Sequence, residues 1–266
     1  MAVTTMDGLV AAIAAGQSVQ TLETSITTVA SSFFSLWTAP GNPGAGATPA
    51  SGAGAAPTNA TAGAIPFTNP GGSNTAYLAK LGAYASQIET LLLVDRLVHT
   101  AGLSGTVITA QTVSSTAITR NYPGGTANAN GLWIEVYGAL GATGATATVI
   151  YTNQAGATTQ SGTATIPASA KVGALYPVSL ASGDYGVRAV TSVQLSISTG
   201  TAGSFGVTLT WSLASIVVML AGTGQALDYA GLGLPVVQSG ACLGYYVLCN
   251  ATASGNVLTN LLFAQG

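Results

Sequence analysis

Short segments of alternating apolar and polar residues dominate the second half of this chain. In residues 190–198 the apolar Val193, Leu195 and Ile197 alternate with polar residues, a pattern typical of a half-buried β-strand. Strands are predicted over residues 107–113, 132–137, 146–151, 158–166, 174–180, 188–198 and 205–218. The residues Asn153-Gln154-Ala155-Gly156 predict a hairpin turn between two of them. The fold class predicted is mainly β, with an antiparallel sandwich or jelly-roll-like domain.

The first 38 residues predict an ordered N-terminal arm made of a short helix and a strand. Thr5 can cap the helix and Gly16 can end it. The strand covers residues 26–37 and ends in four large apolar side chains, which need a partner surface. These side chains are Phe33, Phe34, Leu36 and Trp37. We therefore predict that they contact another protein subunit.

Residues 39–75 differ in composition from the rest of the chain. Every residue except Ile65 and Phe67 is Ala, Gly, Pro, Ser, Thr or Asn, and the segment has no charge. Such a composition cannot bury enough apolar area to fold alone. Two interpretations stay open. The segment is either an extended linker, with Ile65 and Phe67 as further partner contacts, or a surface loop that these two residues pin to their own domain.

One further helix is predicted directly after this segment. Its apolar residues are spaced four, three and four apart, which places them on one face. They are Tyr77, Leu81, Tyr84 and Ile88. The helix leads into residues 91–99, whose continuous apolar start indicates a buried strand. The β-domain predicted in this way covers residues 76–221.

The last segment, residues 222–266, is rich in Gly and Leu and is predicted to be an apolar contact segment. Residues 235–237 and 245–248 could form edge strands. An exposed edge this apolar would promote aggregation unless another chain covered it. Tyr245 and Tyr246 are therefore candidate contact residues.

The chain has very few ions, with seven acidic and five basic side chains among 266 residues and a net charge of −2. Average domains carry about a quarter charged residues. A surface so poor in charge is weakly protected against association, which predicts a subunit of an assembly, including homo-oligomers. Direct nucleic-acid binding is not expected because there is no basic cluster. No apolar stretch is long enough for a membrane-spanning helix, and the N-terminus lacks the charged region of a secretory signal, which favours synthesis in the cytoplasm.

No residue set typical of an active site stands out. Cys242 lies in a Gly-Ala-Cys-Leu-Gly sequence that has the form of a nucleophile elbow, but the only histidine, His99, precedes it, and no α/β alternation surrounds it. Asp95 and Arg96 would face opposite sides of one strand, which favours a structural ion pair over acid–base chemistry. We predict no enzyme activity, no cofactor and no metal site. Cys242 and Cys249 are predicted to be buried free thiols.

Trp133, Glu135 and Tyr137 would share one face of a strand, an arrangement found in many sugar-binding clefts. A single carboxylate cannot supply the two-carboxylate arrangement of most glycosidases. Two interpretations remain: a carbohydrate-binding or receptor-binding module, and an aromatic strand of the core.

Three stretches, LVDRLVHTAGLSGT at 93–106, ATVIYTNQAG at 147–156 and GVRAVTSVQL at 186–195, resemble virion structural proteins of tailed bacteriophages that infect high-GC bacteria. The resemblance covers roughly residues 1–210. It implies a capsid cement or decoration protein on the virion surface, with the major capsid protein as partner. A tail, collar or head-spike subunit is the alternative. As a cement protein, the chain would bridge neighbouring subunits by residues 1–37, which would add a strand or an apolar anchor to an adjacent subunit.

Overall fold

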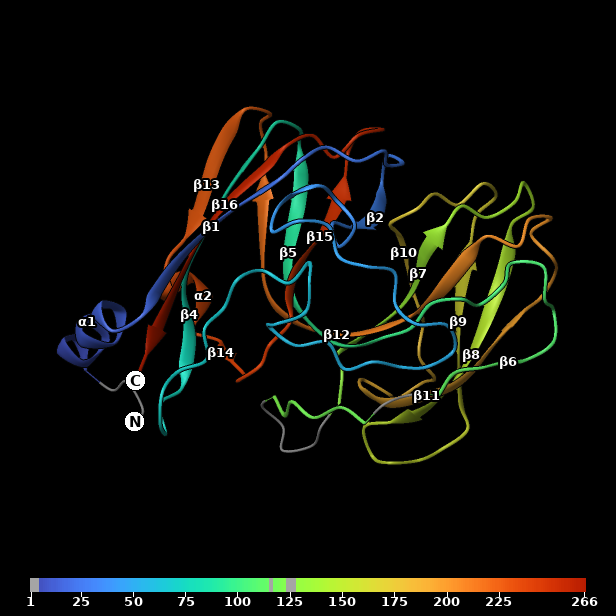
Figure 1. Ribbon diagram of the computed structural model, residues 1–266, viewed down its shortest axis with the longest axis horizontal. Helices are drawn as coiled ribbons and strands as arrows, with labels where there is room; N and C mark the ends of the chain where they lie inside the picture. Colours follow the sequence, from blue (N-terminus) through green and yellow to red (C-terminus); the bar gives the residue numbers. More distant parts are fainter. Residues whose placement is uncertain (1–4, 115–116, 123–127) are drawn as a thin grey trace.

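The computed structural model describes residues 5–114, 117–122 and 128–266. The fold is mainly β, and every pair of named strands is antiparallel. Figure 1 shows three parts side by side: a sheet built from both ends of the chain, a closed barrel, and a second sheet. We call the first of these the terminal sheet.

The barrel closes in the order β10-β2-β15-β5-β12-β7. Its strands are β2 (Ser32–Ser35), β5 (Glu89–His99), β7 (Gly131–Gly138), β10 (Ala174–Pro177), β12 (Ser204–Val218) and β15 (Leu243–Cys249). The six strands come from all parts of the chain, so the barrel joins segments that lie up to about two hundred residues apart.

The terminal sheet has the order β13-β4-β16-β1-β3, and β14 also pairs with β4. Its strands are β1 (Gln17–Glu23), β3 (Gly41–Asn42), β4 (Ala76–Ala85), β13 (Thr223–Leu227), β14 (Val236–Val237) and β16 (Val257–Gln265). The second sheet has the order β6-β11-β8-β9. It contains β6 (Gln111–Thr112), β8 (Ala145–Asn153), β9 (Gln160–Ile166) and β11 (Val187–Leu195). The helices are α1 (Met6–Ala14) and α2 (Tyr229–Leu232).

The core follows from alternation along the barrel strands. On β5, Leu91 and Leu93 belong to the continuous core that also includes Leu261 and Phe263 of the terminal sheet. The intervening residues of β5 face the barrel interior, where a separate apolar cluster lies. That cluster contains Val94, Leu175 and Tyr246 with the half-buried Phe33, Leu92 and Trp133. The barrel wall therefore buries side chains on both of its faces.

Most of the strands predicted after residue 130 are confirmed with small changes in their bounds. They correspond to β7, β8, β9, β10, β11 and β12. The hairpin turn between β8 and β9 is also present, with Gly156 at a φ of 87°, a region that favours glycine. The predicted strand 107–113 is reduced to the two residues of β6. Strand β11 ends at Leu195, so Ile197 is exposed and does not continue the buried row.

The helix predicted from Tyr77, Leu81, Tyr84 and Ile88 is wrong, because residues 76–85 form β4. The pairing of β4 with β16 shifts register between Leu78 and Lys80, which leaves Ala79 as an extra residue. Such a bulge changes the phase of the two-residue alternation. The helix-like spacing mixes residues of the two faces, because Leu81 is buried and Tyr84 is exposed although both follow the bulge.

The separate N-terminal arm is also wrong for the described residues. α1 is confirmed, with the Thr5 hydroxyl accepting a hydrogen bond from the Gly8 amide at 3.0 Å. Strand β1, which the sequence did not predict, pairs with β16 on one side and β3 on the other. Strand β2 is only the end of the predicted strand 26–37, and it lies inside the barrel wall between β10 and β15. Residues 5–38 are therefore an integral part of the domain, and residues 1–4 lie outside the described ranges.

The segment 39–75 is packed over its own domain, as the surface-loop interpretation proposes. Ile65 and Phe67 are 1% and 5% exposed. The Ile65 amide donates a hydrogen bond to the carbonyl of Leu243 at 2.9 Å, and Ala55 pairs with His99. The segment therefore does not release the N-terminal residues to reach another subunit.

The C-terminal segment 222–266 is not a separate contact segment. β15 lies between β2 and β5 in the barrel, and β16 lies between β4 and β1 in the terminal sheet. The prediction that residues 245–248 form an edge strand is wrong, since both of their edges are paired. An apolar strand with no free edge needs no other chain to cover it.

Candidate functional site

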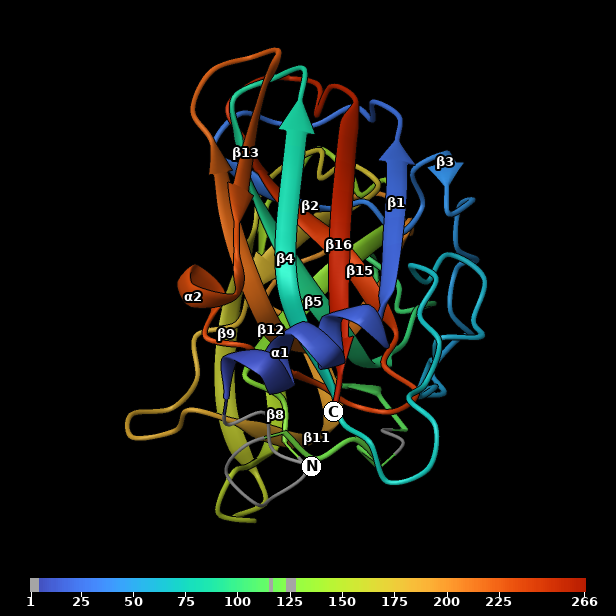
Figure 2. The same cartoon turned by 90° about the vertical axis from the view of Figure 1, so that its left-hand side faces the viewer.

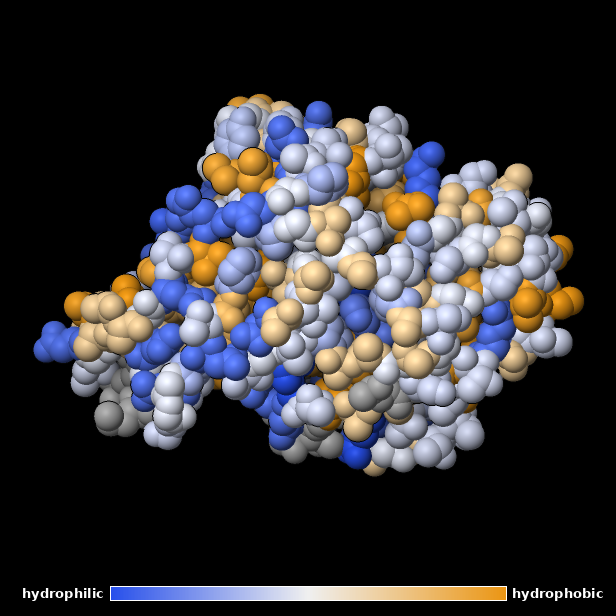
Figure 3. All heavy atoms as spheres, in the orientation of Figure 1, coloured by the Kyte–Doolittle hydropathy of each residue, from blue (hydrophilic) through white to orange (hydrophobic). Residues whose placement is uncertain are grey.

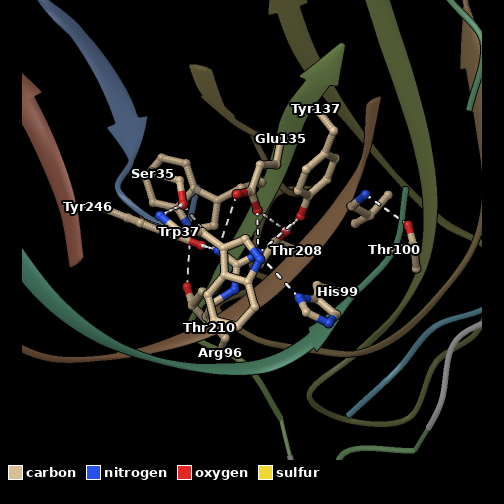
Figure 4. A network of polar contacts seen from close by, with 12 residues as sticks. Ser35, Trp37, Arg96, His99, Thr100, Glu135, Tyr137, Thr208, Thr210 and Tyr246 are labelled. Carbon is tan, nitrogen blue, oxygen red and sulfur yellow. Dashed lines mark hydrogen bonds and ion pairs between the residues drawn. The ribbon is translucent and has the colours of Figure 1, made fainter. Parts of the chain in front are cut away.

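The densest group of ionisable side chains lies inside the barrel. β5 places Arg96 opposite Glu135 of β7, with Nη2 at 2.8 Å from Oε2 and Nη1 at 3.2 Å from Oε1. Each side chain is 1% exposed. Two parallel N–H donors on one carboxylate form a bidentate pair, the strongest common geometry for this contact. Figure 4 shows the pair at the centre of a polar network.

Hydroxyl groups surround the Arg96–Glu135 pair. The guanidinium of Arg96 donates to Tyr137 at 3.0 Å, to Ser35 at 3.2 Å and to Tyr246 at 3.4 Å. Thr208 of β12 donates to the Glu135 carboxylate. Four barrel strands besides β5 thus supply partners, which lowers the cost of burying two charges.

One end of this network is covered by aromatic rings. The Trp37 ring lies over the Arg96 guanidinium, 4.6 Å from its centroid, and meets His99 edge to face. The indole N–H of Trp37 donates to the carbonyl of Ala47 at 2.9 Å, so the segment 39–75 holds this cover in place. His99 Nδ1 lies 3.4 Å from Arg96 Nη2. The network is therefore closed to solvent at this end.

A second buried ion pair lies on the opposite face of β5. Asp95 accepts from Arg120 Nε at 2.7 Å, from the Tyr122 hydroxyl at 2.8 Å and from the Cys242 amide at 2.9 Å. Arg120 also donates to the carbonyl groups of Pro57 and Arg96. The prediction that Asp95 and Arg96 face opposite sides is confirmed. The structure has two ion pairs, Arg96–Glu135 and Arg120–Asp95, where the sequence predicted a single one.

The electrostatics fix the protonation state of the network at neutral pH. Burial alone would raise the pKa of Glu135, but the adjacent Arg96 charge holds it below its usual value. Burial, assisted by Arg96, lowers the pKa of His99 to about 3. A general acid or base should titrate near the working pH and reach its substrate. Neither condition is met by these buried groups, whose contacts are those of a structural network.

Cys242 does not have the surroundings of an activated nucleophile. Its side chain is 0% exposed, and burial raises the pKa of the thiol to about 12. The thiolate is the reactive form, and it is scarce at neutral pH when the pKa is this high. Cys249 is also buried, with its thiol pKa raised to about 11. Both cysteines are free thiols, as the sequence predicts.

These thiols give a direct test of the packing. We expect Ellman's reagent to react with no cysteine in the native protein and with two after unfolding in urea, because both sulfur atoms are shielded. Rapid reaction of either thiol in the native protein would contradict this packing.

The structure places the predicted partner-contact residues inside their own domain. All but Phe33 are buried, and Phe33 is half-buried. The set is Phe33, Phe34, Leu36, Trp37, Ile65, Phe67, Tyr245 and Tyr246. Their role as contacts with another subunit is corrected accordingly. Their large apolar surface is covered by the barrel interior and by the layer between the barrel and the terminal sheet.

Trp133, Glu135 and Tyr137 do share one face of β7, as the alternation predicts. That face is the barrel interior, where Trp133 packs edge to face on Phe33 and Tyr246. The core-strand interpretation therefore fits these three residues, and they do not line an open sugar-binding cleft.

Two open hollows lie on the described surface. One of about 450 Å³ lies beside Ile26, Thr38, Ala139 and Lys171. Another of about 260 Å³ lies beside Ile88, Glu89, Val217 and Cys249, so it borders a carboxyl and a free thiol. Among the residues that the structure describes, no three His, Cys, Asp or Glu side chains are grouped to hold a metal ion.

The molecular surface is even poorer in ions than the composition suggests. Six of the twelve charged side chains are buried: Glu23, Glu89, Asp95, Arg96, Arg120 and Glu135. Those left at the surface are Asp7, Lys80, Lys171, Asp184, Arg188 and Asp228, of which Asp184 and Arg188 are half-buried. The solvent-accessible surface is 10507 Å², so there is one charged side chain for roughly every 1,800 Å² of it. The face drawn in Figure 3 is accordingly mostly pale, with scattered polar and apolar residues.

Comparison with protein-family models, with curated proteins and with solved structures found no match to this chain. Within the described ranges, none of the helices has the length and apolar character needed to cross a membrane.

Proposed function

We propose that this chain is a structural virion protein that binds the shell of a tailed bacteriophage and stabilises it by bridging neighbouring capsid subunits. Its partners in this proposal are the major capsid protein and other copies of itself. Synthesis in the bacterial cytoplasm and residence on the capsid surface are part of the same proposal. It includes no catalysis, no cofactor and no direct contact with nucleic acid.

The observation that carries the proposal is the distribution of charge. Half of the ions are paired or buried inside the domain, and the surface left over is large, neutral and rich in Thr, Ser and Asn. Covering such a surface with protein removes few ions from water, so its desolvation cost is low. The resemblance of residues 93–106, 147–156 and 186–195 to phage virion proteins supports the same function.

The way in which the chain would bridge subunits is revised by the fold. Because β1 and β2 belong to the domain, bridging is proposed to use the faces of one rigid body in place of a released arm. A tail, collar or head-spike subunit would share these features and stays the alternative. We also propose that this fold, with its barrel and two sheets, belongs to the jelly-roll class; that assignment stays a prediction.

The proposal is tested by adding the purified chain to heads of a mutant phage that lacks the gene for this chain. We expect the chain to sediment with the heads and to raise the temperature at which they release DNA. Binding should change little between about 0.05 and 0.5 M salt, because few ions lie in the contact. An absence of co-sedimentation at any salt concentration would contradict the proposal.

A further inference from the structure

The outer face of the terminal sheet is only partly covered by its own chain. α1 lies across one end of this face, where Ala12 packs against Ala79 and Ala264. Figure 2 shows the face directly, with α1 crossing the lower part of β4, β16 and β1. The upper part of the same strands has no layer over it.

The uncovered part consists of two neighbouring rows of outward residues. The pairing places Leu22 opposite Leu258, and Leu258 opposite Tyr84, in what we call the large row. These three side chains are 43%, 45% and 41% exposed. Two residues further along each strand lies the small row, in which Gln20, Asn260, Gly82 and Ala226 are in register. A ridge of bulky side chains therefore runs beside a groove of short and polar ones.

A hollow of about 170 Å³ lies in this groove, beside Gln20, Gly82 and Asn260. Gly82 is not required there by the chain's own packing. A Cβ atom at Gly82 would come no closer than 3.6 Å to any neighbour, and its backbone has no positive φ. Glycine within a strand weakens it and often marks a close approach of another group. Among residues 5–114, 117–122 and 128–266, no such group fills the hollow.

Charge is absent from both rows. The neutral area ends at the next row toward α1, which contains the positive charge of Lys80. The negative charge of Asp7 lies beyond it, on α1. When two copies of one surface meet, side chains of the same charge can be brought close together, which costs free energy. A face without charged side chains avoids this repulsion.

We propose that this outer face is the interface between two copies of the chain. The two copies are related by a two-fold axis. This axis runs parallel to the two rows and lies midway between them. It places the large row of each copy against the small row of the other. One bulky side chain then enters the hollow over Gly82. The resulting contact is that of two sheets packed face to face. This inference rests on the homo-oligomeric part of the proposed function and names its surface.

Sedimentation velocity of the purified chain alone tests this interface, without phage heads. We expect a concentration-dependent dimer for the natural sequence. Gly82→Val fills the hollow with a residue that favours strands, and Leu258→Lys places like charges across the axis. Each should weaken the dimer at least tenfold. Ile197→Lys is the control, since Ile197 is 51% exposed beyond the end of β11 in the second sheet and should leave dimerisation unchanged.

A chain that stays monomeric at millimolar concentration would overturn the proposal. It would also be overturned if Gly82→Val, checked for folding by circular dichroism, dimerised as well as the natural sequence. A monomer that still binds phage heads would refute this interface and leave the proposed function standing. A dimer that never binds heads would do the reverse.

Discussion

Replacing Arg96 by alanine should destabilise the domain by about 3–5 kcal/mol, as measured by the free energy of unfolding in urea. The substitution leaves the Glu135 carboxylate inside the barrel without its bidentate partner. It also removes the group to which Ser35, Tyr137 and Tyr246 are hydrogen-bonded, and opens a cavity under the Trp37 ring. An unpaired buried charge is far more costly than a missing pair.

A double-mutant cycle separates these effects. Arg96→Met combined with Glu135→Leu should cost less than either Arg96→Met or Glu135→Leu alone, because no charge then remains unpaired. Arg188→Ala is the matched control, since Arg188 is only half-buried and belongs to no ion pair among the described residues. It should cost less than about 1 kcal/mol. If Arg96→Ala were as mild as the control, the network would not be the structural centre described above.

The second large effect expected is a loss of stability as the pH rises from about 4.5 to about 8. Glu23 and Glu89 are 4% and 3% exposed, and neither belongs to an ion pair among the described residues. Both oxygens of Glu89 and Oε2 of Glu23 have no hydrogen-bond partner among the residues that the structure describes. Burial raises the pKa of each carboxyl to about 8. The folded chain therefore keeps protons that the unfolded chain releases above pH 4.5.

The sign of the dependence follows from this difference in bound protons. Between the two pKa values the free energy of unfolding falls with rising pH, by up to about 1.4 kcal/mol per pH unit for each group. Above about pH 8 both states have lost the protons and these groups cause no further change. Glu135 and His99 act oppositely, because the pKa of each is lowered. The Glu135 contribution is lost only as the pH falls through the acid range. The His99 pKa falls from 6.5 to about 3, so His99 offsets part of the loss of stability up to about pH 6.5.

Glu89→Gln and Glu23→Gln test this dependence by replacing each carboxyl with a neutral amide of similar shape. Each should raise the free energy of unfolding at pH 8 by a few kcal/mol and change it little at pH 5. Asp7→Asn is the control, because Asp7 is exposed on α1. Equal stability of the natural chain at pH 5 and pH 8 would contradict the buried, unpaired state of the two carboxyls.

The central strands were predictable because each keeps a run of alternating residues, as in Val193 and Leu195 of β11, although register shifts interrupt the pairing of β11 with β8. β4 was not, because Leu81 and Tyr84 lie on opposite faces of the strand and their spacing matches a helical turn by coincidence. β1 was missed for another reason: its sequence, QSVQTLE, is mostly polar. The closed barrel was beyond sequence reasoning, since pairs such as Phe34 with Val247 join distant segments and leave no local signal.

Part of the charged network was also predictable. The opposite directions of Asp95 and Arg96 follow from their adjacency on one strand. Their partners, Arg120 and Glu135, come from remote segments, and spacing alone gives no indication of them. One signal was available: an arginine in an otherwise apolar strand is almost never fully buried without a partner. The same reasoning, applied to the other charged residues in apolar strands, would have predicted several charged side chains in the interior.

The central claim is that the neutral surface of this chain lies against the protein shell of a phage head. Electron cryomicroscopy of purified virions that carry a labelled tag after Gly266 tests it most directly. The claim predicts labelled density on the outside of the head, at the junctions between neighbouring capsid subunits. Label confined to the tail or collar, or virions without the chain, would contradict it.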